Sequence, residues 1–503
     1  MSQQEKVEEL NGILSEIEQK SHTAKILNYD METACPEGGR QDDGTDITKL
    51  QGEIFALEKS EAYSRLVKEL YEEKDSLSLY EKRLVTLLHR KQESEECLDS
   101  KTEQERDQLF NDAYGIWLKA KKDNSYQEFA PTLEKIARMQ KHLLEIRKDY
   151  DKEHPYTTLF SDYEYGFTEE DLDKFFEELQ EGIVPLLNKV RKASYIPRHD
   201  FLNRKVPICR QSKFTTYLLE HNGFDFERGS VSTTEHPFTE QFGENDVRIT
   251  TKYLENAFIS NMFTVIHEGG HALFGQNLTK ETFTYHLGDS SLTMAKHESV
   301  SRFYENVIGK SLPYISSIYP KFHALFQEQM GDVSEEDFYE GANYIDLENP
   351  LRTEADELTY SLHILIRYRM EKEMLSGKAD FQNLDKEWNR LYKEILGIDV
   401  KDSRTGILQD VHWASGFGYF PTYALGNALN CIYVKKLAKD LPLEKTLKEG
   451  NMTAILDWMK KNVFAPAPLM DTKEWIKSIT GEEFSAKPYI DYLTKKYTAL
   501  YRL

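Results

Sequence analysis

A five-residue motif, HEGGH at 267–271, is the clearest chemical signal in the sequence. His267 and His271 stand four residues apart, so on a helix their imidazoles project from one face and can bind one metal ion together. Glu268 follows the first histidine directly, which turns its carboxylate towards the open side of the metal, where it can take a proton from water. The spacing predicts a catalytic metal centre with Glu268 as general base; the alternative is two core histidines beside a surface glutamate.

A catalytic zinc ion usually has three protein ligands and one open position, so a third ligand must be found. The residues after His271 lack the glycine and histidine of an HExxHxxGxxH motif, which excludes that short third-ligand loop. Glu298 lies on a later segment that is typical of a helix, and two helices packed together would bring its carboxylate back to the metal. From spacing alone, His297 and His286 are rival ligands.

The motif lies in a segment, 258–274, whose apolar residues recur at helical spacing, and this pattern predicts a buried helix. Gly269 and Gly270 would each cost that helix about 1 kcal/mol. This cost is easier to understand if another backbone or a substrate passes close to the two glycines.

The rest of the chain predicts a mainly α fold. Helical spacing runs through the first 150 residues, for example at 79–89, and Thr168 with Asp171 is typical of a helix start. Between 196 and 250, glycines and prolines interrupt the helical pattern, and residues 246–250 alternate polar and apolar. We expect a large helical body with a small antiparallel sheet near 230–252, beside the HEGGH helix.

The composition of the chain argues against several classes of function. The 503 residues carry a formal net charge of −22, which argues against binding to nucleic acid or to anionic lipid. No signal peptide and no run of 18 apolar residues is found, so we expect a protein that is neither secreted nor membrane-spanning. The 4 cysteines form no CxxC pair, and we interpret them as small buried residues in a reducing cytoplasm.

Several motifs in order carry a resemblance to a known family. The HEGGH motif followed by HESVSR at 297–302 resembles the M32 metallocarboxypeptidases, the thermostable or Taq-type carboxypeptidase family. Further matches follow the family's order: NYDMETACPEGG at 28–39, HPF at 236–238, DVRIT at 246–250, LRTEADELTY at 351–360 and GILQDVHW at 406–413. Each match alone is weak, but together and in order they are very specific. The chain departs from the family at Tyr29, Cys35 and Leu351, which puts details of the substrate subsites in doubt.

The resemblance implies a single peptidase domain over 1–503, mostly helical and gluzincin-like, with a deep substrate groove. We expect two possible sub-lobes, a helical one at 1–195 and a catalytic one at 196–503. The resemblance also implies a zinc or cobalt ion, a homodimer, and stepwise release of C-terminal residues from peptides. The family's metal ligands carry over to His267, His271 and Glu298, and its general base carries over to Glu268.

A carboxypeptidase must bind a free α-carboxylate, for which a guanidinium is the best-shaped donor. Arg352 is the candidate that the family supports, and Arg248 is the second; the alternative for each is a salt bridge to a nearby acid. The motif that contains Arg248 and Asp246 resembles the element thought to limit how the C-terminal end of the substrate extends. Asp246 and His236 complete the candidate substrate-binding residues.

Two further roles are expected near the cleft. An edge strand at 246–250 could hold the peptide extended by backbone pairing, which suits broad specificity. His412 and Tyr423, in an aromatic and glycine-rich neighbourhood, could donate to the oxyanion that forms when water attacks the scissile carbonyl. The alternative for both is a packing role.

The sequence therefore predicts a zinc-dependent exopeptidase that acts on peptides with a free C-terminus. One alternative is a related helical oligopeptidase or dipeptidyl carboxypeptidase, which would use the same metal motif and cut further from the end. Another is a peptide-binding protein without turnover, although metal binding alone does not require Glu268.

Overall fold

The computed structural model describes residues 1–288 and 291–503, and its chain forms two compact units. Unit 1 comprises Met1–Gln92, Asp200–Ala342 and Lys436–Met470, and unit 2 comprises Glu93–His199, Asn343–Lys435 and Asp471–Leu503. Each unit is thus assembled from three separate segments. The sequence predicts sub-lobes that divide near residue 195, and one of the observed segment boundaries lies close to that point.

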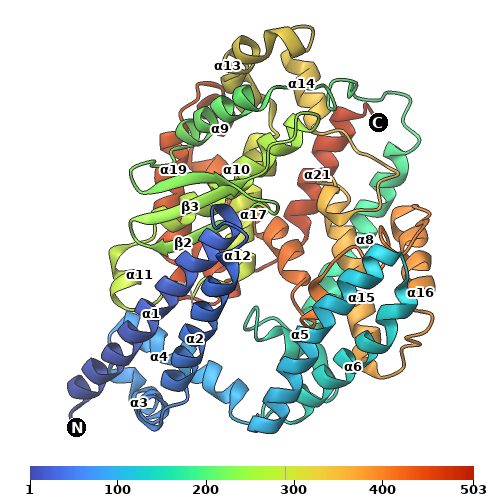
Figure 1. Ribbon diagram of the computed structural model, residues 1–503. Helices are drawn as coiled ribbons and strands as arrows, with labels where there is room; N and C mark the ends of the chain where they lie inside the picture. The colour runs from blue at the N-terminus through green and yellow to red at the C-terminus, as the bar shows by residue number, and fades with distance from the viewer. Residues whose placement is uncertain (289–290) are drawn as a thin grey trace. The chain divides into compact units, whose positions relative to one another are not determined.

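Unit 1 contains the N-terminal helices, the sheet and the helices beside the sheet (Figure 1). Its N-terminal helices are α1 (Gln3–Thr33), α2 (Arg40–Glu58), α3 (Glu61–Glu72) and all but the last three residues of α4 (Leu79–Glu95). Its later helices are α9 (Ile208–Asn222), α10 (Phe258–Gln276), α11 (Lys280–Thr284), α12 (Met294–Arg302), α13 (Leu312–Met330), α14 (Glu335–Ala342), α18 (Leu443–Lys448) and α19 (Met452–Met459). The helix predicted at 79–89 is confirmed as part of α4.

Three strands form the sheet in unit 1: β1 (Gly229–Thr233), β2 (Thr239–Gly243) and β3 (Asp246–Thr251), in the order β1-β3-β2. β2 pairs with β3 antiparallel, but β1 pairs with β3 parallel, so the sheet is mixed rather than antiparallel as predicted. β3 is the central strand. The prediction of an edge strand at 246–250 is therefore wrong, because neighbouring strands already occupy both of its hydrogen-bonding edges.

Helix α10 is the buried centre of unit 1 and confirms the helix predicted at 258–274. It contacts β3, α9, α12 and the π-helical segment η2 (Phe303–Gly309), which continues directly from α12. Most of its side chains are buried, including Phe258, Val265 and Ile266. A helix enclosed in this way holds its polar side chains in fixed directions, which a metal centre requires.

A buried lysine fixes the start of α12. Lys296 is 0% exposed, and its ammonium donates to the carbonyl of Ala467 at 2.9 Å and to that of Met470 at 2.6 Å. Backbone carbonyls thereby satisfy a cation that would be costly to bury alone. The N-terminal turn of α12 is tied in this way to a chain segment far along the sequence.

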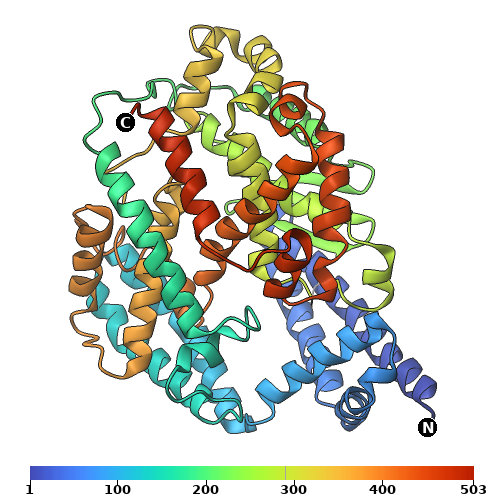
Figure 2. The ribbon, with the colours of Figure 1, turned by 180° about the vertical axis from the view of Figure 1, so that it is seen from behind.

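Unit 2 is helical in all of its described elements. Its helices are α5 (Ser100–Asp123), α6 (Tyr126–Glu145), α7 (Pro155–Phe160), α8 (Glu169–Val190), α15 (Tyr360–Ser376), α16 (Leu384–Leu391), α20 (Thr472–Thr480) and α21 (Lys487–Leu500). α17 (Pro421–Asp440) contains residues of both units. Figure 2 shows α21, in red, beside α8, in green. α8 begins with the capping box predicted at Thr168 and Asp171.

Among residues 1–288 and 291–503, every helix is too short or too polar to cross a lipid bilayer.

Candidate metal centre and catalytic residues

Helices α10 and α12 approach each other most closely at Gly270. A Cβ atom on Gly270 would lie 2.7 Å from Cα of Ser301 and 3.1 Å from the carbonyl oxygen of Val300. Only glycine leaves room for the α12 backbone here. The expected close approach of another backbone is therefore observed at Gly270, and it brings Glu298, on α12, towards the two histidines of α10.

His267, His271 and Glu298 form one cluster in unit 1. Oε2 of Glu298 lies 3.5 Å from Nε2 of His267 and 3.7 Å from Nε2 of His271. The candidate ligand atoms of the three residues all lie within 4.8 Å of one another. Ligands at tetrahedral zinc distances stand ~3.3 Å apart. The donor set and its spacing therefore fit a catalytic zinc ion, which prefers two imidazoles, a carboxylate and one open position.

Charged groups behind the cluster orient its carboxylate and one imidazole. Nε of Arg302 donates to Oε1 of Glu298 at 2.7 Å, which leaves Oε2 facing the histidines. Nδ1 of His267 lies 2.9 Å from Oε2 of Glu305, and Arg302 also contacts Glu305 at 3.0 Å. The spacing of Glu298 and Arg302, four residues apart on a helix, is visible in the sequence, but sequence reasoning missed Glu305.

These contacts shift the pKa values of the cluster. Burial lowers the pKa of His267, but the carboxylates of Glu298 and Glu305 outweigh burial and raise it. Burial raises the pKa of Glu298, but Arg302 and the histidines outweigh burial and hold the pKa well below its usual range. Glu298 is thus kept ionised, which is the form that ligates a metal.

The two rival ligands have other partners. Nδ1 of His297 lies 3.4 Å from Nδ1 of His271, and burial lowers the pKa of His297 to about 3. His286 pairs with Glu18 of α1 at 2.9 Å. Neither belongs to the cluster of three, so the geometry favours Glu298 as third ligand.

Glu268 is fixed by a residue that sequence reasoning missed. Oγ1 of Thr239, on β2, lies 2.6 Å from Oε2 of Glu268, and Glu268 is only 7% exposed. The sheet beside α10 thus orients the carboxylate that follows the first histidine. No local pattern signals this contact, because it depends on how β2 lies against α10.

The candidate substrate-binding residues of unit 1 lie on the sheet and in the loop between β1 and β2. Arg248 forms two hydrogen bonds to Asp246, at 2.8 and 2.6 Å, and its guanidinium lies over the rings of Tyr29 and Phe242. The salt-bridge alternative is therefore observed for Arg248. His236 is exposed in the loop between β1 and β2.

Unit 2 brings Arg352 into a buried ion network, so the salt-bridge alternative is observed for Arg352 as well. Arg352, which is 7% exposed, contacts Oδ1 of Asp410 through Nε at 3.0 Å and through Nη2 at 2.8 Å. Arg367 of α15 contacts Oδ2 of the same carboxylate at 2.7 Å. Burial raises the pKa of Asp410, but the two guanidiniums outweigh it and hold the pKa far below its usual range. Two cations share one anion, which leaves this network with an excess of one positive charge.

His412 and Tyr423 lie next to this network. Nε2 of His412 is 3.4 Å from the Tyr423 hydroxyl, and the guanidinium of Arg352 lies 5.2 Å from the centre of the Tyr423 ring. Burial lowers the pKa of His412 to about 4, so its imidazole is neutral at pH 7 and carries one N–H donor. The structure therefore brings Arg352, His412 and Tyr423 together.

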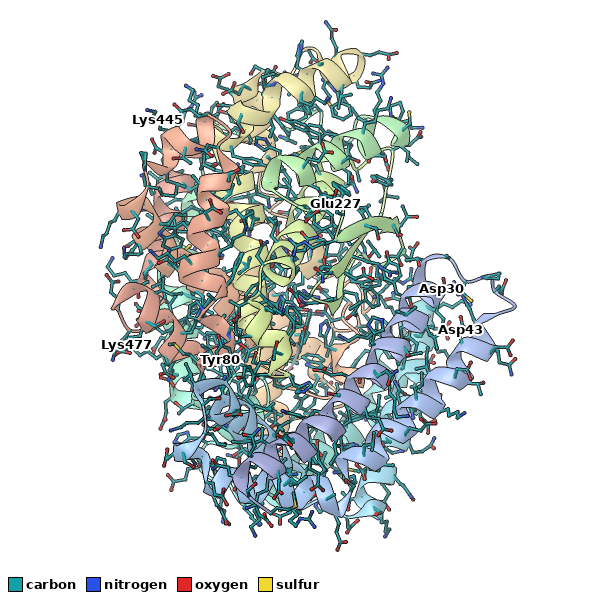
Figure 3. The ribbon with its side chains drawn as sticks, turned by 90° about the vertical axis from the view of Figure 1, so that its left-hand side faces the viewer. Asp30, Asp43, Tyr80, Glu227, Lys445 and Lys477 are labelled. Atoms are coloured by element: carbon teal, nitrogen blue, oxygen red, sulfur yellow. The ribbon has the colours of Figure 1, made fainter. Side chains whose placement is uncertain are left out.

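A second group of potential ligands, Asp30, Cys35 and Asp43, lies where α1 and α2 meet (Figure 3). Asp30 is exposed, and Cys35 and Asp43 are half-buried. Exposed acidic groups of this kind are common on protein surfaces without a metal. We therefore assign no site to this group.

Comparisons with known proteins agree with these observations. Residues 9–497 match the family described as carboxypeptidase Taq (M32) metallopeptidase. The chain is 35% identical over 497 residues to carboxypeptidase 1 of Bacillus subtilis, covering 98% of each chain. It is 36% identical over 403 residues to thermostable carboxypeptidase 1 of Thermus thermophilus, covering 78% of each.

A solved structure shows the same fold. The chain superposes on the M32 carboxypeptidase of Deinococcus radiodurans with a TM-score of 0.93, at 29% identity and with 100% of both chains covered. The cluster of His267, His271 and Glu298 accords with a family whose activity depends on a divalent metal. The chain therefore belongs to the carboxypeptidase Taq (M32) family of metallopeptidases, which are metal-dependent hydrolases that act on peptides.

Proposed function

We propose that this protein is a zinc-dependent carboxypeptidase that releases C-terminal amino acids one at a time, with broad specificity. The observation that supports this most directly is the cluster of His267, His271 and Glu298, with Glu268 on the same helix as the two histidines. His267, His271 and Glu298 would hold the ion. A bound zinc ion, or cobalt in its place, supplies Lewis-acid polarisation of the scissile carbonyl and makes water a stronger acid.

Glu268 is the proposed general base and acid. Its carboxylate takes a proton from the attacking water and passes it to the amine of the departing residue. The 2.6 Å contact from Thr239 to Oε2 supports this role, because it fixes the orientation of the carboxylate. Because His267, His271 and Glu298 already supply three ligands, the Glu268 carboxylate is left to act on the proton.

Arg352 is the proposed partner of the substrate's terminal carboxylate. Its network carries two guanidiniums for one carboxylate, Asp410, so it can accept a further anion. Arg248 suits this role less well, because Asp246 alone already neutralises it with two hydrogen bonds.

His412 and Tyr423 are the proposed donors to the oxyanion. A neutral imidazole N–H and a phenolic O–H both donate without a change of charge, and preorganised donors of this kind typically contribute about 100-fold or more to kcat. Their proximity to Arg352 supports this proposal, because the three side chains lie in one region of unit 2.

The homodimer and the deep groove that the resemblance implies stay predictions. The four cysteines are free, which supports a cytoplasmic location. Only Cys431 is buried, so the interpretation of all four as buried residues is wrong: Cys209 is exposed, and Cys35 and Cys97 are half-buried.

The test is mass spectrometry of one decapeptide, prepared with a free and with an amidated C-terminus and incubated with the protein, with and without a chelator. We expect a ladder of single-residue losses from the free C-terminus only, abolished by chelation and restored by zinc. Internal or two-residue cuts would instead indicate an oligopeptidase or a dipeptidyl carboxypeptidase. No cleavage after zinc or cobalt is restored would indicate a peptide-binding protein.

Substitution of Glu268 tests its proposed role as general base. E268Q keeps the shape of the side chain but cannot accept the proton, so kcat should fall by about 10²–10⁴-fold. Zinc content, measured by atomic absorption, should equal that of the wild type, because Glu268 is not a ligand. An active E268Q protein would contradict its role as the base.

A further inference from the structure

Helix α15 carries two buried polar side chains, Arg367 and Glu371, one turn apart, and both are 0% exposed. Arg367 binds Asp410, two residues before His412. Glu371 binds Trp413, the residue directly after His412, through the indole Nε1 at 2.9 Å. One helix therefore holds the chain on both sides of His412.

Glu371 accepts hydrogen bonds from three groups. Oε1 accepts from Nε1 of Trp413, and Oε2 accepts from the Tyr156 hydroxyl at 2.6 Å and from the backbone N–H of Gly418 at 3.0 Å. Burial raises the pKa of Glu371 to about 7 even though all three donors favour its ionised form. The three donors satisfy the oxygens of this buried carboxyl, and Glu371 in turn gives three otherwise unpaired donors an acceptor.

The segment that Glu371 holds is closely confined. Gly418 has φ of +95°, and a Cβ atom there would lie 2.8 Å from the Tyr163 ring and 2.9 Å from Leu159. The backbone path after His412 therefore has little freedom, and the hydrogen bond from the Gly418 N–H to Glu371 fixes its far end.

The His412 imidazole has few polar contacts of its own. Its Nε2 is 3.4 Å from the Tyr423 hydroxyl, and among the residues that the structure describes its Nδ1 makes no hydrogen bond. The direction of its N–H donor must therefore be set mainly by the backbone that carries it and by the packing of its ring against Phe420.

We propose that Glu371 is a positioning residue for catalysis: by binding Trp413 and Gly418 it sets the direction of the His412 imidazole. This inference rests on the proposed function, in which His412 donates to the oxyanion. Glu371 does not touch substrate. It acts through His412, because a donor displaced by about 1 Å loses much of its effect on the transition state.

The test is a double-mutant cycle with E371Q and H412A, using a short N-blocked peptide with a free C-terminus. In either orientation of the amide that E371Q introduces, its NH2 group faces an N–H donor, so the segment must move. At pH 8, where the Glu371 carboxyl is ionised, we expect E371Q to lower kcat by about tenfold or more, with KM and zinc content within about twofold of the wild type. The E371Q/H412A protein should have the same kcat as H412A alone, because Glu371 has nothing left to position.

A buried carboxylate in the same unit provides the matched control. Glu164 is 0% exposed and accepts from Thr472 Oγ1 at 2.6 Å, and E164Q should change kcat by less than about twofold although it too alters a buried hydrogen bond. If E371Q lowers kcat by the same factor in the H412A background as in the wild type, Glu371 acts independently of His412 and the proposal is overturned.

The same cycle separates failure of this inference from failure of the proposed function. If H412A alone keeps full kcat, the oxyanion role of His412 is wrong, and the positioning role of Glu371 falls with it.

Should E371Q fail to fold, Y156F removes one of the three donors to Glu371 and keeps the ring. It should lower kcat by a smaller factor in the wild type and by none in H412A, and an equal loss in both backgrounds would overturn the proposal.

Discussion

Glu305 is not one of the candidate metal ligands, yet it decides which nitrogen of His267 is free. Because its carboxylate accepts from Nδ1 at 2.9 Å, that nitrogen carries the hydrogen and Nε2 presents a lone pair to the cluster. Arg302 and Lys310 hold Glu305 in place at 3.0 and 3.2 Å. A carboxylate behind a metal-ligating histidine also makes the imidazole a stronger ligand.

Removal of this carboxylate should weaken zinc binding. E305Q should lower zinc affinity by about 10–100-fold, measured by competition with a chromophoric chelator. The matched control is E328Q, which removes an exposed carboxylate that pairs with Arg210 and should leave zinc affinity unchanged. Equal affinity of E305Q and wild type would show that another contact sets the tautomer of His267.

The site could be predicted from the sequence where its residues follow one helix. His267, Glu268 and His271 share a regular spacing, and the four-residue step from Glu298 to Arg302 is also helical. Glu305 stands a helical step of three residues after Arg302, but its contact with His267, 38 positions away, depends on how the segment after α12 packs against α10 and could not be predicted. Thr239 could not be predicted either, because its contact with Glu268 depends on tertiary packing.

At the scale of elements, the contact between α10 and α12 determines whether Glu298 reaches the histidines. G270A places a Cβ atom 2.7 Å from the Ser301 backbone, so the two helices must separate. We expect a loss of about 1–3 kcal/mol in the free energy of unfolding, together with weaker zinc binding. Chemical denaturation and chelator competition on the same preparation measure both effects.

G12A is the matched control for this substitution. Gly12 lies in the exposed part of α1, and nothing lies within 4 Å of a Cβ atom there. Alanine is the better helix former, so G12A should stabilise the protein by up to about 1 kcal/mol and leave zinc binding unchanged. If G270A also stabilised the protein, the close approach of α12 would not restrict this position.

The helices and strands can be predicted from the sequence more readily than the elements against which each of them packs. The alternation at 246–250 correctly predicts a strand, but it does not reveal that β1 pairs with that strand in parallel. Strand order depends on a contact between residues well apart in sequence: a Cβ atom on Gly229 would lie 2.4 Å from the carbonyl oxygen of Val247. Local patterns contain no information about such pairings.

For the whole molecule, the buried carboxyl of Glu371 links stability to pH. Burial raises its pKa from 4.5 to about 7, so between these values the folded chain keeps a proton that the unfolded chain has lost. The contribution of this group to the free energy of unfolding is therefore full below pH 4.5 and falls as pH rises to 7. The total change is up to about 3 kcal/mol.

E371Q lacks this proton, which gives a direct test by thermal or urea unfolding. Whatever the difference in stability between wild type and E371Q at pH 5, it should move in favour of E371Q at pH 8. A difference that stays constant over this range would mean that Glu371 has the same pKa in the folded and unfolded states.

The way in which distant segments combine into units is harder to predict from the sequence than the helices and strands are. The expectation of a single peptidase domain with possible sub-lobes at 1–195 and 196–503 stays a prediction. The contacts within the chain group it into two units of three segments each. Composition and periodicity describe neighbours along the chain, but what joins these segments is contact between residues such as Lys296 and Ala467.

The hydrogen bond from Lys296 to Ala467 can form only after both residues have been translated. These residues are 171 positions apart, and a ribosome adds about 5–20 residues per second, so roughly 10–30 s separate their translation. During that interval the nascent chain already contains both histidines and Glu298, but not the carbonyls that anchor α12. We therefore expect the start of α12 to be fixed only after residues 467–470 have been made, near the end of translation.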